Sequence, residues 1–175
     1  MSWFTKMIGT QLTLNNLQNL LVQQLRDLLS AEEQLIEALP KMADAAASTE
    51  LKMAFRNHLG ETRQQKSRLE QALRSMREEA TSETCDAMKG LISEGAEIID
   101  AEGDAEVKDA ALIAAAQRVE HYEIAGYGCA RTFAQRLGLE SVARLLQETL
   151  DEEANADKLL THIGEHIINM EAARA

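Results

Sequence analysis

Apolar residues recur along this chain in alternating steps of three and four, which is the period of an amphipathic α-helix. In the first clear segment the apolar stripe consists of Leu21, Leu25, Leu28, Leu35 and Leu39. Comparable stripes follow in four later segments, so the pattern predicts five helices. We expect them at about 15–46, 49–79, 85–102, 104–137 and 141–170.

Residues that favour helix ends mark the boundaries between these segments. Asn15, with Gln18 three residues later, predicts an N-cap with a capping box for the first helix. Ser48 predicts a short break before the second helix, and Gly138 predicts the end of the fourth. Pro40 lies inside the first helix and predicts either a kink or the end of its regular part.

These helix lengths predict an all-α fold, an antiparallel four-helix bundle with a short extra helix in the crossover. An apolar content of 45% in 175 residues is enough to fill one core. No segment rich in Pro, Gly or Ser divides the chain. We therefore expect a single domain over residues 1–175, with an irregular N-terminal segment over residues 1–14.

The acidic balance of the chain excludes several kinds of partner. It has 29 acidic and 18 basic residues, and the formal net charge of −11 repels both nucleic acids and anionic lipids. No apolar run approaches the roughly 20 residues of a membrane span, and the start of the chain lacks a secretory signal pattern. Cys85 and Cys129 lie far apart, which suits reduced thiols. We expect a cytoplasmic protein that binds neither nucleic acid nor membranes.

Glutamates and one histidine occupy positions where the helical pattern calls for apolar residues. The set comes from four helices and comprises Glu32, His58, Glu61, Glu120, Glu123 and Glu152. Each unpaired buried charge costs several kcal/mol, whereas a domain of this size is stable by roughly 5–15 kcal/mol. If these side chains face one another, cations must neutralise them.

Counting from the turns tests whether these acids can meet. Glu32 lies 16 residues before Ser48, and Glu61 lies 13 residues after it. In the second hairpin, Glu123 and Glu152 lie 15 and 14 residues from the turn. Because residues at equal distances from a hairpin turn lie side by side, both hairpins place their acids at one height.

Several carboxylates and one imidazole at one height are typical of a dinuclear site in a ferritin-like bundle. The spacing of three residues from His58 to Glu61, and from Glu120 to Glu123, places both members of each pair on one helix face. We therefore predict that these residues, with Glu32 and Glu152, bind two divalent metal ions. Iron is favoured and manganese is the alternative.

The pattern leaves alternatives open at individual residues. Any one glutamate could belong to a solvated helix face, and Glu153 or Asp157 would replace Glu152 if the last helix were rotated. His58 could be a hydrogen-bonded core histidine instead of a ligand. Tyr127 could donate a hydrogen bond to a ligand, act as a redox-active phenol, or simply pack in the core.

Four strings carry a resemblance to a known family: DAALIAAAQRVEHYEIAGYG, AEEQL, HLGET and LLQETLDEE. They resemble the YciE/YciF family of ferritin-like bacterial stress proteins, over essentially the whole chain after residue 15. The resemblance implies a ferritin-like bundle, a dimer in place of a storage shell, a dinuclear metal motif and a link to stress, without a settled activity. On this chain that motif falls on Glu32, Glu61, Glu120, Glu123 and Glu152.

The chain departs from the wider ferritin-like pattern, in which Glu-x-x-His occurs on two helices. Here the second helix reads His58-x-x-Glu61 in reversed order, and Asn155 stands where a histidine would follow Glu152. A site with one imidazole at most is rich in oxygen ligands. It weakens the case for dioxygen chemistry and suits manganese, magnesium or weakly held iron.

The sequence leaves two main classes of function and does not decide whether the chain is an enzyme. The first is a dinuclear metal-binding protein of the bacterial stress response, with ferroxidase or peroxide-consuming activity. The alternative is a non-catalytic helical homodimer, a structural or interaction protein with a buried acidic cluster. In that case Trp3, Phe4, Met7 and Ile8 would dock on a partner. An oxygenase acting on an organic substrate is a weaker third class.

Overall fold

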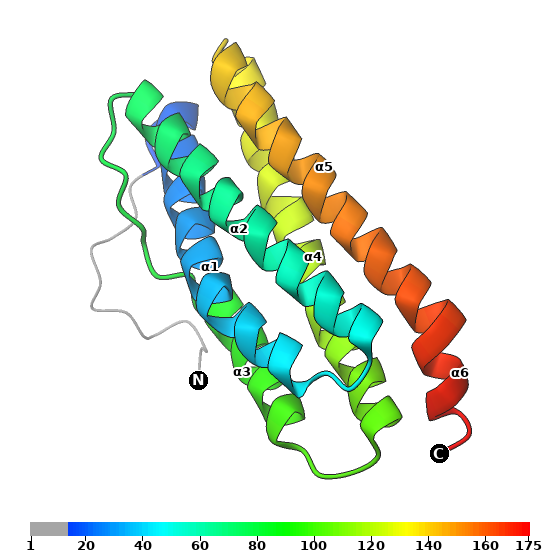
Figure 1. Ribbon diagram of the computed structural model, residues 1–175. Coiled ribbons are helices and arrows are strands. Elements are labelled where there is room, and N and C mark those ends of the chain that lie inside the picture. Colours follow the sequence, from blue (N-terminus) through cyan, green and yellow to red (C-terminus); the bar gives the residue numbers. More distant parts are fainter. Residues whose placement is uncertain (1–13) are drawn as a thin grey trace, which may run out of the picture.

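The computed structural model describes residues 14–175, and the N-terminal positions Trp3, Phe4, Met7 and Ile8 lie outside the described residues. Within residues 14–175 every regular element is a helix (Figure 1). The four long helices are α1 (Leu17–Ala45), α2 (Thr49–Ser75), α4 (Ala105–Arg136) and α5 (Glu140–Ile163). The predicted all-α four-helix bundle is confirmed. None of the described helices is long and apolar enough to cross a membrane.

Two helical hairpins, α1 with α2 and α4 with α5, pack side by side to form the bundle (Figure 1). Helix α1 also contacts α4, and α2 also contacts α5. The crossover between the hairpins contains the short helix α3 (Asp86–Asp100), which packs against α1 and α4. This crossover returns the chain to the end of the bundle at which α2 began, so α2 and α4 run in the same direction.

The observed boundaries differ from the predicted ones at several helix ends. The N-cap of α1 is Asn16, whose Oδ1 accepts a hydrogen bond of 2.8 Å from the Asn19 N–H, so Asn15 was the wrong member of the asparagine pair. Pro40 does not end α1, which continues to Ala45. The last helix runs without a gap from Glu140 to Ala172, close to the predicted 141–170, but it is not α-helical throughout. A π-helical turn, η1 (Gly164–Ile168), separates α5 from the short helix α6 (Asn169–Ala172).

The core consists of two apolar clusters, one toward each end of the bundle. One cluster contains Leu35, Leu39, Phe55, Leu112 and Leu160. The other contains Leu25, Leu69, Leu73, Ala130 and Leu146. Buried polar side chains lie on all four helices at the positions between the two clusters, and we call this region the polar layer. The layer consists of Glu32, His58, Thr62, Gln65, Glu120, Glu123, Thr149 and Glu153.

A buried aspartate fastens the two hairpins together at one end of the bundle. Asp109 on α4 is 2% exposed, and its two carboxylate oxygens accept hydrogen bonds from the N–H groups of Ala47 (2.9 Å) and Ser48 (2.7 Å). These N–H groups belong to the turn between α1 and α2. The contact therefore fixes the first hairpin relative to the second, and with it the relative height of the polar side chains on the four helices.

We predict that Asp109→Ala lowers the free energy of unfolding by about 2 kcal/mol, because two hydrogen bonds to a charged acceptor are lost. Urea denaturation followed by circular dichroism would measure the change. The control is Asp44→Ala near the same turn, where the side chain is 79% exposed and the ion pair with Arg56 is weak. An equal effect of the two substitutions would contradict the fastening role of Asp109.

Candidate metal centre

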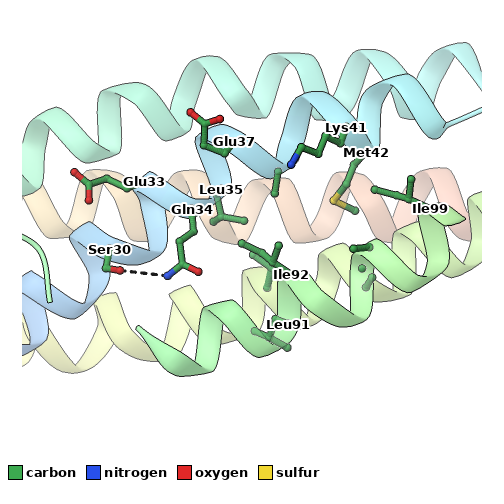
Figure 2. A pocket seen from close by; sticks show the side chains of 15 residues that line it. Ser30, Glu33, Gln34, Leu35, Glu37, Lys41, Met42, Leu91, Ile92 and Ile99 are labelled. Carbon is green, nitrogen blue, oxygen red and sulfur yellow. Dashed lines mark hydrogen bonds between the residues drawn. The ribbon is translucent and has the colours of Figure 1, made fainter. Parts of the chain in front are cut away.

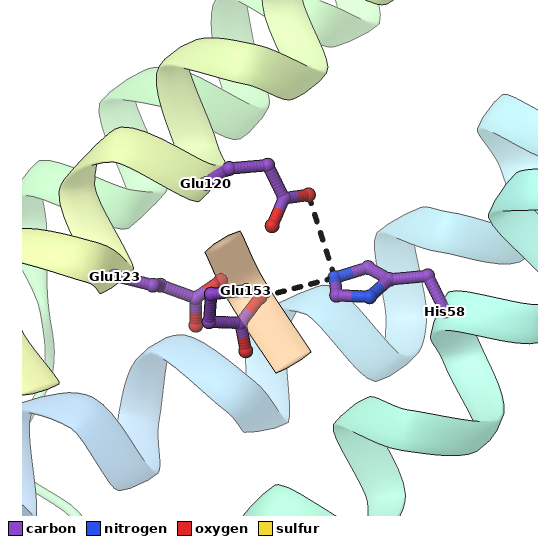
Figure 3. A group of neighbouring side chains, drawn as sticks. All are labelled: His58, Glu120, Glu123 and Glu153. Atoms are coloured by element: carbon purple, nitrogen blue, oxygen red, sulfur yellow. Dashed lines mark ion pairs between the residues drawn. The ribbon is translucent and has the colours of Figure 1, made fainter. Parts of the chain in front are cut away.

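The titratable members of the polar layer converge from all four long helices. They are Glu32 on α1, His58 on α2, Glu120 and Glu123 on α4, and Glu153 on α5. The Nε2 atom of His58 lies 3.4 Å from Glu120 Oε1 and 3.6 Å from Glu153 Oε2 (Figure 3). His58, Glu120, Glu123 and Glu153 each offer one ligand atom, and these atoms lie within 4.8 Å of one another.

These distances suit a divalent cation. Small divalent ions such as Mg²⁺ hold oxygen ligands at about 2.1 Å, so two ligands of one ion are at most about 4.2 Å apart. A small side-chain movement would therefore bring the four ligand atoms onto one ion. Nitrogen and carboxylate oxygen are also the donors that Mn²⁺ and Fe²⁺ accept.

Several buried polar atoms of the layer form no hydrogen bond, which is also compatible with cation binding. Eight buried atoms of the layer lack a hydrogen-bond partner. One is Gln65 Oε1, and the other seven are candidate ligand atoms: Glu32 Oε2, His58 Nε2, Glu120 Oε2, and both carboxylate oxygens of Glu123 and of Glu153. An unsatisfied buried polar group costs about 1–3 kcal/mol, and native proteins contain few of them. So many in one layer could be satisfied by a cation, or by protons that the carboxylates share with one another.

Burial and mutual repulsion change the acidity of the layer. Burial raises the pKa of Glu32, Glu120 and Glu123 well above the ordinary value of 4.5, and the neighbouring carboxylates raise it further. Burial also raises the pKa of Glu153. Without a cation these acids therefore hold protons at pH values where exposed glutamates have lost them.

The acidity of His58 shifts for a different reason. Burial opposes its protonation, but the hydrogen bond to Glu61 and the charge of Glu153 outweigh that effect and raise the pKa above 6.5. His58 is therefore more easily protonated in the metal-free protein than an exposed histidine. Coordination of a cation by Nε2 would require the loss of any proton there.

Tyr127 holds Glu32 in the layer. Its hydroxyl donates a hydrogen bond to Glu32 Oε1, and the ring is fully buried. Gly126 on α4 faces Leu28 on α1 at this level, and a Cβ atom there would lie 2.8 Å from Leu28 Cδ2, so the leucine side chain would have to shift. Tyr127 is therefore a hydrogen-bond donor to the candidate site in addition to packing in the core.

Glu61 was predicted to share an ion with His58, but the structure places it outside the group of converging ligand atoms. Its Oε2 lies 3.2 Å from His58 Nδ1, the ring nitrogen that faces away from Glu120 and Glu153, and its side chain is 46% exposed. The spacing of three residues did bring the two side chains together. The contact orients the imidazole, because it leaves Nε2 directed at the carboxylates.

Glu152 was also predicted in the group, and here the structure requires a correction. Its carboxylate turns away and forms a bidentate pair with Arg68, with N···O distances of 2.6 and 2.7 Å. The neighbouring Glu153 is fully buried and takes the inward position. Two leucine doublets, 145–146 and 159–160, make either phase of α5 look apolar. A stripe that contains Glu152 also contains Leu145 and Leu159, but the structure buries Leu146 and Leu160 instead.

A cavity lies outside the group of converging ligands, between α1 and α3 (Figure 2). It has a volume of about 400 Å³, and mostly apolar side chains line it, including Leu35, Met42, Leu91, Ile92 and Ile99. None of the five converging titratable residues is among its lining residues. The cavity is therefore a separate feature of the fold.

Comparison with known proteins places the chain among bacterial relatives. The sequence profile of a family described as a domain of unknown function, DUF892, matches residues 16–173. Protein YciF of Escherichia coli (strain K12) is 43% identical over 162 residues, which cover 92% of this chain and 98% of that protein. The resemblance to the YciE/YciF family is thus confirmed.

Solved structures agree with this relationship. The crystal structure of the E. coli stress protein YciF matches with a TM-score of 0.86 and covers 89% of this chain and 99% of that chain. YcfI of Rhodopseudomonas palustris, described as a candidate structural protein, matches with a TM-score of 0.83 and 37% identity. That match covers 89% of this chain and 98% of YcfI.

We predict that the metal-free protein loses stability as the pH rises from 5 to 8. The native state keeps protons on Glu120 and Glu153 above pH 4.5, where the unfolded chain releases them, and on His58 above pH 6.5. The contribution of these protons to the free energy of unfolding is therefore fully present below the unfolded pKa values. It is lost as the pH rises through the raised native pKa values. Urea denaturation in the presence of a chelator would measure it.

The matched control for this pH dependence is the double variant Glu120→Gln, Glu153→Gln. Neutral amides have no proton to lose, so the stability of this variant should vary less between pH 5 and pH 8 than that of the wild type. Equal slopes for the two proteins would show that Glu120 and Glu153 do not hold the extra protons.

Proposed function

The chain belongs to the DUF892 family, and we propose that it is a dinuclear metal-binding protein whose ions lie in the polar layer. The observation that carries this proposal is the convergence of five buried titratable side chains with seven unpartnered ligand atoms. E. coli YciF is described as a stress protein, and we extend that role to this chain.

Charge balance supports two ions instead of one. Four buried glutamates carry four negative charges when ionised, and two divalent cations would neutralise them. Both oxygens of Glu123 and of Glu153 lack protein partners, so each of these residues would offer two ligand atoms. Glu120 and Glu32 each have one unpartnered oxygen, and His58 has Nε2, so these three would each offer one ligand atom.

Two further side chains would orient these ligands without contacting the ions bound in the layer. Glu61 accepts from His58 Nδ1 and fixes the tautomer in which Nε2 carries no hydrogen. Tyr127 occupies one oxygen of Glu32 and leaves the other for a cation. Contacts of this kind usually change metal affinity by 10- to 100-fold when they are removed.

We propose Fe(II) as the substrate of the site. Two Fe(II) ions release two electrons on oxidation to Fe(III), and hydrogen peroxide takes up these electrons and two protons to leave as two waters. The polar layer would contribute by holding two cations close together and by accepting or releasing protons at its carboxylates. Manganese remains the alternative ion, because the site has one imidazole and is otherwise made of oxygen donors.

The competing candidate is a non-catalytic helical dimer with a structural role. YcfI of R. palustris is described as a candidate structural protein, which favours this alternative. Protonated glutamates would then replace cations in the layer, as the raised pKa values of Glu120 and Glu123 allow. The two candidates differ in whether the isolated protein contains metal, which elemental analysis measures directly.

We predict that Glu153→Gln and Glu152→Gln, at adjacent positions, have opposite outcomes. Glu153→Gln should lower the number of bound Mn(II) ions from two to one or none, because it removes a buried carboxylate. Glu152→Gln should retain both ions, because that carboxylate pairs with Arg68. Equilibrium dialysis followed by elemental analysis gives the stoichiometry. Loss of binding in Glu152→Gln alone would refute the ligand set.

We predict that the protein accelerates the oxidation of Fe(II) by hydrogen peroxide at least tenfold over buffer. The rate is followed by the near-ultraviolet absorbance of ferric iron, with wild type and Glu123→Gln compared at equal concentration. Glu123→Gln should fall to the buffer rate, since both oxygens of Glu123 are directed into the layer without partners. Full binding of iron without acceleration would favour the non-catalytic candidate.

A further inference from the structure

We propose that metal ions and peroxide enter the polar layer through a small cavity between α2, α4 and α5, and that Glu61 receives the cation at its outer edge. This inference rests on the proposed function. It adds the path by which substrates reach the polar layer and an upper limit on their size. The cavity has a volume of about 180 Å³, and we call it the mouth.

The mouth connects solvent with the converging ligands. His58 and Glu120, which are 7% and 2% exposed, belong both to the lining of the mouth and to the group of ligand atoms. Its walls are apolar and include Phe55 and Ala156. Exposed polar side chains, such as Asn155, form its outer part together with Glu61. An ion or small molecule that fills the mouth therefore contacts two of the proposed ligands, His58 and Glu120.

The charge of the mouth favours cations. Glu61 and Glu120 line it, and no Lys or Arg is among the lining residues that the structure describes. Glu61 is 46% exposed and contacts His58, so a cation held by its carboxylate would be one side chain away from the layer. A cleft of one charge sign with apolar walls focuses the field and raises the local concentration of the opposite ion.

The part of the polar layer beside Arg68, farther along α2 than His58, is closed to cations. Arg68 lies there, and both oxygens of Glu152 bind its guanidinium at 2.6 and 2.7 Å. Gln65 donates to the same carboxylate at 3.2 Å, and Arg68 also donates to Thr149 at 3.3 Å. A guanidinium keeps its positive charge at all physiological pH values, so it repels a metal ion at this position.

The size of the mouth restricts what can enter. Pockets for organic ligands usually measure about 300–1,000 Å³, so 180 Å³ is too small for most of them. At about 30 Å³ per water molecule, the space holds a partly hydrated ion or a few small molecules. The mouth therefore suits Fe(II), Mn(II) and hydrogen peroxide, and it argues against the organic substrate that an oxygenase would require.

Blocking the mouth tests the route. Ala156→Leu places a larger side chain in the wall, whereas Ala154→Leu makes the same change two residues away at a position outside the lining. With Co(II) as the probe and stopped-flow absorbance as the readout, Ala156→Leu should load at least tenfold more slowly at unchanged final stoichiometry. Ala154→Leu should load like the wild type. If Ala156→Leu impairs folding, Asn155→Phe at the exposed edge takes its place.

The role of Glu61 is tested in the same assay. Glu61→Gln keeps an oxygen that can accept from His58 Nδ1 but removes the charge, so loading should slow several-fold and lose most of its dependence on salt. Loading of Glu61→Gln at the wild-type rate, with unchanged salt dependence, would overturn the role of Glu61 as the receiving residue.

A readout without metal separates this inference from the proposed function. The C2 hydrogen of His58 exchanges slowly in D₂O, and peptide mass spectrometry measures the rate. Exchange should be at least threefold slower in Ala156→Leu than in Ala154→Leu. If the wild type binds no Co(II), the proposed function fails, while exchange still tests the mouth. Equal exchange rates in the two variants would overturn the mouth itself.

Discussion

The structure depends on the cost of removing carboxylates from water. The polar layer interrupts the apolar interior at one height, and its four buried glutamates are too close to ionise together without compensation. Protons can provide that compensation in the metal-free protein, and divalent cations can provide it in the proposed state. Fold and function are therefore coupled, because the same helices that bury the acids also bring in the groups that must neutralise them.

Much of the architecture could be predicted from the sequence because the helical period and the helix ends are local signals. Ser48 lies in the break before α2, as expected, and the fourth helix ends just before Gly138. The inward positions of Glu32, Glu120 and Glu123 followed from single apolar stripes. The rotation of α5 could not be predicted, because its leucine doublets fit two helical phases and only packing against α2 and α4 selects one.

Glu61 illustrates a different limit of sequence reasoning. Spacing along α2 correctly indicated that it lies on the same side of the helix as His58, but spacing does not say how far each side chain reaches inward. The His58 imidazole lies in the interior, whereas the Glu61 carboxylate lies at the edge of the bundle, where solvent reaches it. The reversed order of histidine and glutamate on α2 therefore has a structural meaning. His58 enters the layer, and Glu61 orients its ring from the edge.

The position of the layer, between two apolar clusters that each involve several helices, has a consequence for the lifetime of the protein in a cell. A ligand that binds only the folded chain stabilises it in proportion to the logarithm of its concentration. Ions shared by four helices would act on the whole bundle at once, and a chain that lost them would open more often to proteases. The abundance of such a protein would then rise and fall with the supply of its metal, without any change in its synthesis.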